Sequence, residues 1–437
     1  MMDEAATAIL LTGLPLLGAL GGLALWSRPA ILKIYSVATA VVTLGAVAWT
    51  SGSIVSPTEG ILLLYLLPVT AATSLLGQPV HPLHRSSWIM TLVFLGLGLG
   101  VITHQGPGGR LCLIAIVCLA AVLLYRHHTP LWPMSWWGIG TYGFGAVMAA
   151  ISLVAAPPLS AVASLTACAV LLPLAPFHGG YLAALTRLPG SLPPFLAALL
   201  PALGLHDLAA VITATPDGLA AAITVVAVGG AAYGAVKALA QSRVRLRLAY
   251  GSLSFLSILW WFAAATGGMA PSATVYVSAV ALVTSGLLMS WQVIRTRYGD
   301  DIDPQAISGL ASPMPRFAVL LSLLALAAIG LPPFGVFAGF VGLLLSSAVS
   351  FSIAIPIVLL AWLAASWYIL DLVQRLLFGR QRSDLRYADL CRTEFASLLL
   401  VVLALLALGV TPAQLIGSGT MMPPTTTTAT GSLAWTK

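Results

Sequence analysis

Few ionisable side chains lie inside or beside the long apolar segments of this sequence, and these few are its candidates for proton or ion chemistry. His178 follows two prolines in the segment 171–180. Histidine titrates near neutral pH, as a proton relay requires. His178 therefore serves either as a pathway residue or as a donor to a backbone carbonyl that the prolines leave free. His206 and Asp207 lie toward one end of an apolar segment, where they form either a proton uptake or exit point or a polar cap.

Three further ionisable residues lie within apolar segments nearer the C-terminus. Lys237 is close to the end of its segment, so its long side chain either reaches the polar boundary or takes part in a relay. Asp371 and Arg375 are four residues apart, which places them on one face of a helix where they can pair. That pair is either a structural ion pair or a contact for a partner subunit. Together with the two histidines and Asp207, these residues are the ion-pathway candidates.

The sequence carries no motif for other kinds of chemistry. It has no glycine loop for phosphate, no nucleophile elbow and no set of residues with metal-ligand spacing. The four cysteines form no CxxC pair, and we interpret them as small apolar side chains. We therefore expect no metal, no cofactor and no catalytic centre in the chain itself. Any part in an oxidoreductase would depend on its partners.

The composition requires a bilayer as the solvent. The chain has 437 residues, of which 59% are hydrophobic and only 7% are charged, whereas a soluble domain has about 25% charged residues. Backbone groups in hydrocarbon must be satisfied internally, which restricts spans to helices or a closed barrel. The apolar runs here are long rather than alternating over segments of about 10 residues, so helices are favoured. The predicted fold class is all-α, a polytopic transmembrane helical bundle.

About fourteen segments are long enough to cross the hydrocarbon core, which takes about 20 apolar residues. Those at 159–185 and 315–347 are interrupted. The segments are expected near 6–26, 31–50, 60–77, 88–103, 110–126, 134–156, 159–185, 189–213, 217–239, 245–266, 271–294, 315–347, 352–378 and 394–415.

The basic residues support this count, because successive loops alternate between the two sides of a membrane. Fourteen spans place all but two of the 19 Lys and Arg residues on one side, the exceptions being Arg110 and Lys437. The positive-inside rule makes that side cytoplasmic. We therefore expect an integral protein of a bacterial inner (cytoplasmic) membrane with both termini on the non-cytoplasmic side. The net charge of +7 then orients the chain and does not indicate a nucleic-acid partner.

Paired prolines interrupt one segment in each half of the chain. Proline removes a backbone donor and clashes with the carbonyl one turn back, so helix breaks are predicted at Pro173 and Pro176 and at Pro332 and Pro333. Broken helices at membrane depth occur where protein or a water-filled cavity surrounds them. The two breaks indicate either an inverted repeat of the transporter type or two kinks that serve packing.

Four segments, taken in order, resemble the antiporter-like subunits of respiratory complex I and their relatives in cation/proton antiporters and membrane-bound hydrogenases. PFH at 176–178 followed by LPGS at 188–191 resembles the family signature PFHxWLPxAxxxAPTPVSA, and residues 241–252 resemble QxDxKRxLAYSS. Residues 327–339 resemble LAxxGxPPxxGFxxK, and residues 368–379 resemble the segment that closes the family core. The resemblance covers nearly the whole chain and implies a core of fourteen spans with discontinuous helices.

The resemblance also implies a midplane row of lysines, a glutamate and a histidine that forms a hydrated proton path. In this sequence the corresponding positions are apolar or neutral, and one acidic position is basic. They fall near Leu171, in the acid-free segment 111–125, near Ala197, near 202–204, in 278–286, at Phe340 and, for the acid that becomes basic, at Arg243. Aliphatic and aromatic side chains cannot accept or release a proton. We therefore expect a subunit of a larger redox-driven or ion-coupled complex, in contact with other membrane subunits and lipid, with a structural or modulatory role.

The chain is expected to form a single membrane domain over 1–420, followed by a Thr-rich, disordered tail at 421–437. Two other functions stay open at this point. A stand-alone secondary transporter for a small solute would use the broken helices to line its site. A membrane partner of an inorganic-carbon uptake complex would resemble the same family. A stand-alone carrier purifies alone and a subunit with other membrane chains, whereas a zinc-bearing partner would indicate the carbon-uptake role.

Overall fold

The computed structural model describes residues 4–51, 58–104, 106–127, 133–215, 217–298, 307–346, 353–379 and 388–411. The predicted tail at 421–437 lies outside them. Within these ranges the regular structure is entirely helical. The helices are α1 (Glu4–Ala24), α2 (Pro29–Thr50), α3 (Thr58–Leu76), η1 (Pro82–His84), α4 (Arg85–Thr103), α5 (Pro107–Arg126), α6 (Pro133–Val154), α7 (Leu159–Leu171), α8 (Gly179–Arg187), α9 (Leu192–Val211), η2 (Ile212–Ala214), α10 (Asp217–Ala240), α11 (Val244–Thr266), α12 (Pro271–Tyr298), α13 (Pro315–Ile329), α14 (Gly335–Leu344), α15 (Ala354–Leu377) and α16 (Arg392–Val410).

These helices confirm the predicted polytopic bundle. Each α-helix falls in one of the fourteen predicted segments, and observed and predicted first residues differ by at most three. The interrupted segments contain α7 with α8 and α13 with α14. Eleven helices in the described part are long and apolar enough to cross a membrane, and α3, α7, α13 and α14 are shorter apolar helices.

The first break contains Pro173 and Pro176, the prolines at which it was predicted. α7 ends at Leu171, the next residue, Leu172, is extended, and α8 begins only at Gly179. Ending a helix leaves carbonyl groups without partners, which is costly away from water. The indole Nε1 of Trp260 on α11 donates to the Leu172 carbonyl at 2.9 Å. A side chain from a neighbouring helix thus stabilises the broken end.

At the second break, backbone hydrogen bonds stabilise the end of α13. Gly330 follows α13 in the left-handed conformation, with φ of 79°, and its N–H donates to the Ala327 carbonyl at 3.1 Å. The Leu331 N–H returns to the Leu326 carbonyl at 3.2 Å. This pair of backbone bonds is a common helix ending that satisfies terminal carbonyls. Both predicted discontinuities are therefore confirmed.

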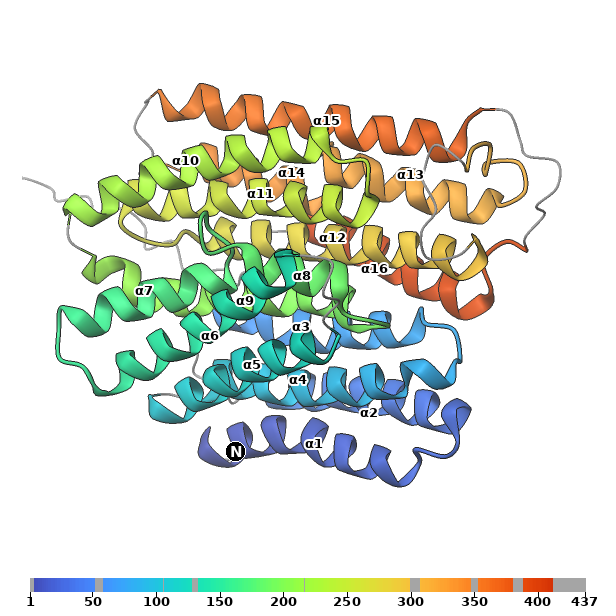
Figure 1. Ribbon diagram of the computed structural model, residues 1–437, viewed down its shortest axis with the longest axis horizontal. Helices are drawn as coiled ribbons and strands as arrows, with labels where there is room; N and C mark the ends of the chain where they lie inside the picture. The colour runs from blue at the N-terminus through green and yellow to red at the C-terminus, as the bar shows by residue number, and fades with distance from the viewer. Residues whose placement is uncertain are drawn as a thin grey trace, which may run out of the picture.

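The long helices lie side by side and run roughly along one direction (Figure 1). α1 and α2 lie along the lower edge of that view and α15 along the upper edge. In the most apolar 18-residue stretch of α12, 100% of the residues are buried inside the molecule. In the corresponding stretches of α10 and α15, only 33% are buried. α12 therefore forms the centre of the bundle, and α1, α2, α10 and α15 form its periphery.

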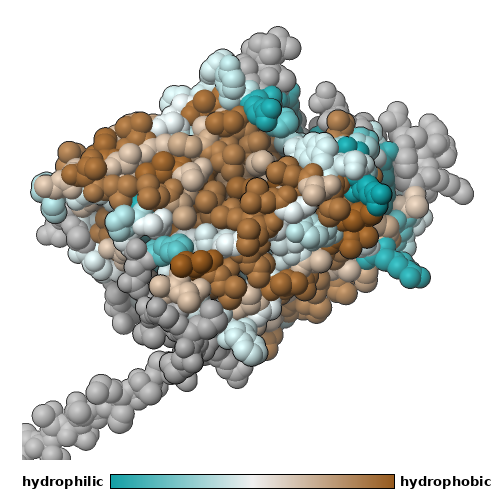
Figure 2. Space-filling view, turned by 90° about the horizontal axis from the view of Figure 1, so that it is seen from below, coloured by the Kyte–Doolittle hydropathy of each residue, from teal (hydrophilic) through white to brown (hydrophobic). Residues whose placement is uncertain are grey.

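The peripheral surface is apolar, as a surface in contact with lipid would be. Seen from the edge formed by α1, brown hydrophobic residues cover the middle of the molecule, and the most hydrophilic residues gather mainly toward its margins (Figure 2). Large exposed side chains on this edge include Ile9, Leu17 and Trp49. The fold therefore presents a hydrophobic belt whose polar groups lie near the helix ends.

The two broken segments run in opposite directions across the bundle. They are the seventh and the twelfth segments, so four crossings lie between them and the chain enters them from opposite ends. Opposite entry is the relation between corresponding helices of an inverted repeat. The arrangement is consistent with the repeat that the prolines indicate.

Candidate functional site

The first helix break lies between α6 and α10. Phe177 stacks on Phe144 of α6, with ring centres 5.6 Å apart and an interplanar angle of 11°. The ring of His178 meets Tyr233 of α10 edge-on at 5.6 Å and lies 6.5 Å from Tyr250 of α11. These contacts bring one predicted pathway residue, His178, into an aromatic setting.

His178 has no hydrogen-bond partner in the described part of the chain, and its Nδ1 is buried. The hypothesis that it bonds a freed carbonyl at the break is not seen in the structure, where Trp260 takes the Leu172 carbonyl. Its possible role as a pathway residue stays a prediction.

Lys237 lies close to the same aromatic group. Its ammonium Nζ is 5.8 Å from the centre of the Tyr233 ring, one helical turn earlier on α10. Helical side chains point toward the N-terminus of their helix, and here that direction leads from the helix end toward the middle of the bundle. No described residue forms an ion pair with Lys237, so the cation depends on the aromatic contact.

Deeper in the bundle, the polar groups near the first break are neutral hydroxyls. The Tyr181 hydroxyl on α8 hydrogen-bonds the Ser252 hydroxyl on α11 at 2.7 Å. The Tyr142 hydroxyl on α6 is buried and has no partner among the residues described. Phenol and alcohol groups hydrogen-bond but do not ionise near neutral pH.

Four aromatic rings fill the space beside the second break; we call them the aromatic cluster and define it as Phe255, Tyr276, Phe340 and Trp362. Phe340 and Trp362 stack with centres 3.7 Å apart and planes at 14°. Phe255 lies 5.2 Å from Trp362, and Tyr276 lies 6.3 Å from Phe340. The Tyr276 hydroxyl donates to the Phe255 carbonyl at 2.9 Å. The position where the resemblance implies a lysine thus holds a ring packed against other rings.

The other positions expected to be neutral are buried in the bundle. Leu171, Ala197 and Ala202 are 0% exposed. On the central helix α12, Ser278 and Ser285 are also 0% exposed, and their hydroxyls find no partner in the parts of the chain described. The interior between the breaks is therefore apolar, aromatic or hydroxylic.

The charged residues pair close to the helix ends. Asp207 accepts a bond from Arg110 of α5 at 2.9 Å, and His206 lies beside it in the chain. The sequence singled out His206 and Asp207 but gave no partner, because Arg110 is 97 residues away. The predicted pair of Asp371 and Arg375 is present at 2.7 Å.

Asp371 also accepts a bond from Arg247 of α11 at 2.8 Å. Arg247 donates twice more, to the Gln241 carbonyl just after α10, at 3.0 and 2.8 Å. The carboxylate therefore joins the end of α15 to the α10–α11 turn. This supports the structural interpretation of the pair, and contact with a partner subunit stays a prediction.

A further cluster of charged residues was not predicted from the sequence. Arg297 of α12 contacts Glu394 of α16 through two bonds, at 2.7 and 3.3 Å. Lys33 of α2 donates its ammonium proton to the Gln78 carbonyl, and Gln292 of α12 bonds the Gln78 side chain at 2.6 Å. Only an acidic residue in the first turn of α16 hinted at this site, since a carboxylate there favours helix capping.

The buried charged residues in the described ranges share one property: each lies within about five residues of a helix end, or about 8 Å at 1.5 Å per residue. They are Lys33, Asp207, Arg247 and Glu394. No group of three or more His, Cys, Asp or Glu suited to a metal occurs in the described part of the chain. The charges of these four buried residues thus connect helix ends.

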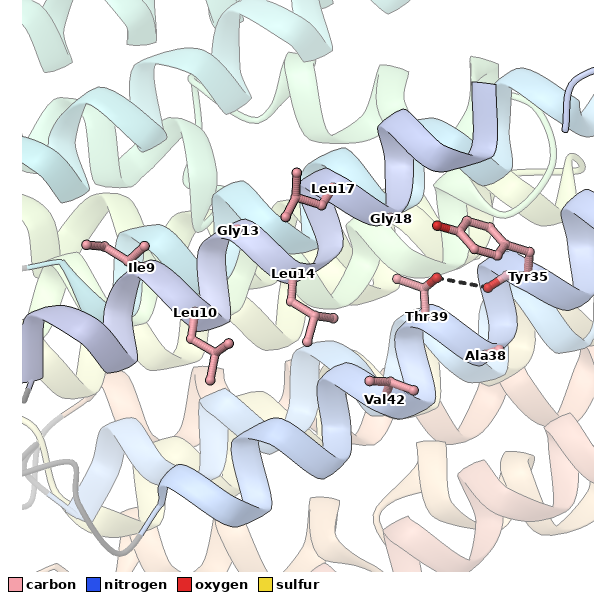
Figure 3. A pocket seen from close by; sticks show the side chains of 10 residues that line it. All are labelled: Ile9, Leu10, Gly13, Leu14, Leu17, Gly18, Tyr35, Ala38, Thr39 and Val42. Carbon is pink, nitrogen blue, oxygen red and sulfur yellow. Dashed lines mark hydrogen bonds between the residues drawn. The ribbon is translucent and has the colours of Figure 1, made fainter. Parts of the chain in front are cut away.

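A surface groove of about 720 Å³ lies between α1 and α2. Leu10, Leu14 and Val42 border it, and the only hydrogen bond drawn there joins the Thr39 hydroxyl to the Tyr35 carbonyl within α2, at 2.9 Å (Figure 3). The groove has no charged side chain in its lining. It therefore suits an apolar neighbour and not an ion.

Solved structures share this architecture at low sequence identity. A chain of respiratory complex I from Thermus thermophilus with bound aureothin is 19% identical, with a TM-score of 0.75 and coverage of 93% of this chain and 98% of that one. A chain of the Mrp complex from Dietzia sp. DQ12-45-1b is 15% identical, with a TM-score of 0.76 and coverage of 95% and 96%. A chain of the membrane-bound sulfane sulfur reductase, an archaeal respiratory membrane complex, is 17% identical, with a TM-score of 0.78 and the same coverage. These likenesses show the fold.

No curated protein sequence matches the chain. The family described as NADH:quinone oxidoreductase/Mrp antiporter, transmembrane, matches residues 134–367, which is more than half of the chain. The match includes both helix breaks, the aromatic cluster and the α10–α11 turn. The chain therefore belongs to the NADH:quinone oxidoreductase/Mrp antiporter transmembrane family.

Proposed function

We propose that this chain is an antiporter-like membrane subunit of a larger redox-driven or ion-coupled complex, and that it supports or modulates that complex without carrying protons itself. The observation behind the proposal is the distribution of charge. In the described residues, the buried acids and bases lie at helix ends, whereas the positions between the two breaks are apolar, aromatic or hydroxylic.

A proton relay needs groups that bind and release protons at the working pH. Leucine, alanine and phenylalanine at Leu171, Ala197 and Phe340 have no such group. The stacked rings of Phe340 and Trp362 also occupy space beside the second break that water would need. A pathway through this centre would lack the relay.

The assembly part of the proposal is supported by the solved relatives, which are chains of multisubunit membrane complexes. The charged residues at the helix ends supply contacts within the chain, and the peripheral helices expose apolar faces to other membrane chains or lipid. We place the arginine-rich ends in the cytoplasm and both termini outside it, in a bacterial inner membrane, because of the positive-inside rule.

The test is a proton-flux assay with the purified chain in liposomes that contain a pH-sensitive dye. After a pH step with a permeant counter-ion, we expect the internal pH to change at the rate of protein-free liposomes. His178→Ala should leave that rate unchanged, because no working relay passes through it. An uncoupler added at the end confirms that the dye still responds.

Flux clearly above that of protein-free liposomes would contradict the proposal. If His178→Ala then abolished the flux, His178 would be a relay residue after all. Purification from native membranes distinguishes a complex subunit from one of the two alternatives, the stand-alone solute carrier. A stand-alone solute carrier would emerge without other membrane chains, whereas a subunit would bring them along in fixed proportion.

A further inference from the structure

One flank of the bundle exposes polar groups at a depth where lipid offers them no hydrogen bonds. This flank, which we call the α6–α10 flank, is formed by Phe144, Phe177, His178, Tyr233 and Lys237. Phe144 and Tyr233 are 41% and 38% exposed, Lys237 is exposed, and Phe177 and His178 are half-buried. The contacts of Phe144 with Phe177 and of His178 with Tyr233 make it a continuous surface.

The depth of the flank follows from helix geometry. His178 lies nine residues before the last residue of α8, and Tyr233 lies seven residues before the last residue of α10. At 1.5 Å per residue, these positions are about 13 and 10 Å from the helix ends. The hydrocarbon core of a bilayer is about 30 Å thick, so both residues lie well inside it.

Two polar groups of the flank, those of His178 and Lys237, lack a hydrogen-bond or ion-pair partner among the described residues. Neither ring nitrogen of His178 is hydrogen-bonded to a described residue, and Nδ1 is buried. Lys237 lies three residues before the last residue of α10, and its ammonium forms no ion pair within the described part. The ammonium is 5.8 Å from the centre of the Tyr233 ring, which belongs to the preceding helical turn, farther from that end. A cation turned toward the middle of a bilayer without a counter-ion is costly.

The neighbouring face of α6 has room for a close helix. A Cβ atom added at Gly140 or Gly143 would meet nothing within 4 Å. Small residues three or four apart let helix backbones approach closely in membranes, where packing drives association. The open face therefore lies beside the unpartnered polar groups.

We propose that the α6–α10 flank binds a transmembrane helix of another membrane chain, and that this helix carries an aspartate or glutamate opposite Lys237 and His178. The inference rests on the proposed function, because it needs a complex with other membrane chains. A carboxylate satisfies both groups, since it accepts charge-assisted hydrogen bonds from the ammonium and the imidazole. Acyl chains satisfy neither.

The test places a photo-crosslinking amino acid at Tyr233 in the full-length chain and irradiates native membranes. A second variant carries the same amino acid at Leu17, which lines the α1–α2 groove and is 68% exposed. We expect the Tyr233 variant to crosslink one membrane chain through a segment that contains an aspartate or glutamate. The Leu17 variant should not capture that segment.

Charge reversal then tests the pairing itself. Lys237→Glu should lower the amount of the captured chain that co-purifies by at least tenfold, and reversal of the partner's acid to lysine should restore it. Arg28→Glu, which reverses another exposed cation at the end of an apolar hairpin, should have no such effect.

Three results would overturn the inference. One is a Tyr233 variant that forms adducts with lipid alone while other membrane chains still co-purify. The second is a crosslinked segment without an acid, and the third is a Lys237→Glu variant that retains its partner. A chain that purifies without any other membrane chain would instead contradict the proposed subunit role.

Discussion

Replacement of Trp260 by alanine is expected to lower the free energy of unfolding by about 3–5 kcal/mol, the range for removing a buried tryptophan. Trp260 is 1% exposed, and its indole is the partner of the Leu172 carbonyl where α7 ends. The substitution therefore leaves a cavity and also an unsatisfied carbonyl at the first break. The melting temperature of the purified variant in detergent measures the effect.

Two control variants separate these causes. Trp260→Phe keeps a ring but removes the donor, and it should cost about 1–3 kcal/mol, the range for leaving a buried polar group unpaired. Trp367→Ala removes a tryptophan that is 73% exposed on α15, and it should change the melting temperature little. If Trp260→Ala were no more destabilising than Trp367→Ala, the indole would not stabilise the broken helix.

Replacement of Gly330 by alanine is expected to destabilise the chain through two additive effects. Gly330 has φ of 79°, a conformation that costs other residues about 1–2 kcal/mol. A Cβ atom at this position would also overlap the indole of Trp362. Forcing extra atoms into a packed core typically costs about 1–3 kcal/mol more. A fall in melting temperature and faster proteolysis of the second break would measure the loss.

Gly267 provides the matched control. It ends α11 with φ of 65°, but a Cβ atom there would meet nothing within 4 Å. Gly267→Ala should therefore show only the conformational cost. Equal falls in melting temperature for the two variants would mean that the rings of the aromatic cluster move aside at little cost in free energy. The cluster would then not close the space beside the second break.

The helical segments and their breaks could be predicted because they depend on local sequence. Apolar runs of span length define most of the helices, and the paired prolines lie in the two breaks, after α7 and before α14. The pairing of Asp371 with Arg375 could be predicted for the same reason, since four residues make one turn of a helix. The helix ends were less certain, because polar residues near a membrane boundary are compatible with either a helix or a loop.

Contacts between distant segments could not be predicted. Arg297 meets Glu394 across 97 residues, and Arg247 meets Asp371 across 124. No local pattern links such partners, because helix packing decides which ends meet. The aromatic cluster shows the same limit. Phe340 was noted as a neutral position, but its stack on Trp362 depends on how α14 lies against α15.

Under the proposed function, the neutral interior gives the family scaffold a use other than proton transfer. Broken helices can be kept for packing when backbone ends find side-chain partners, as Leu172 does with Trp260. The ion pairs at the helix ends then hold the bundle together without forming a path across it.

A density map of the chain in its native membrane complex, at a resolution that shows ordered water, tests this account most directly. We predict that no row of water molecules connects the two helix breaks through the centre, and that the rings of Phe340 and Trp362 remain stacked and dry. Continuous water linked to acids or bases from one side of the bundle to the other would contradict the account.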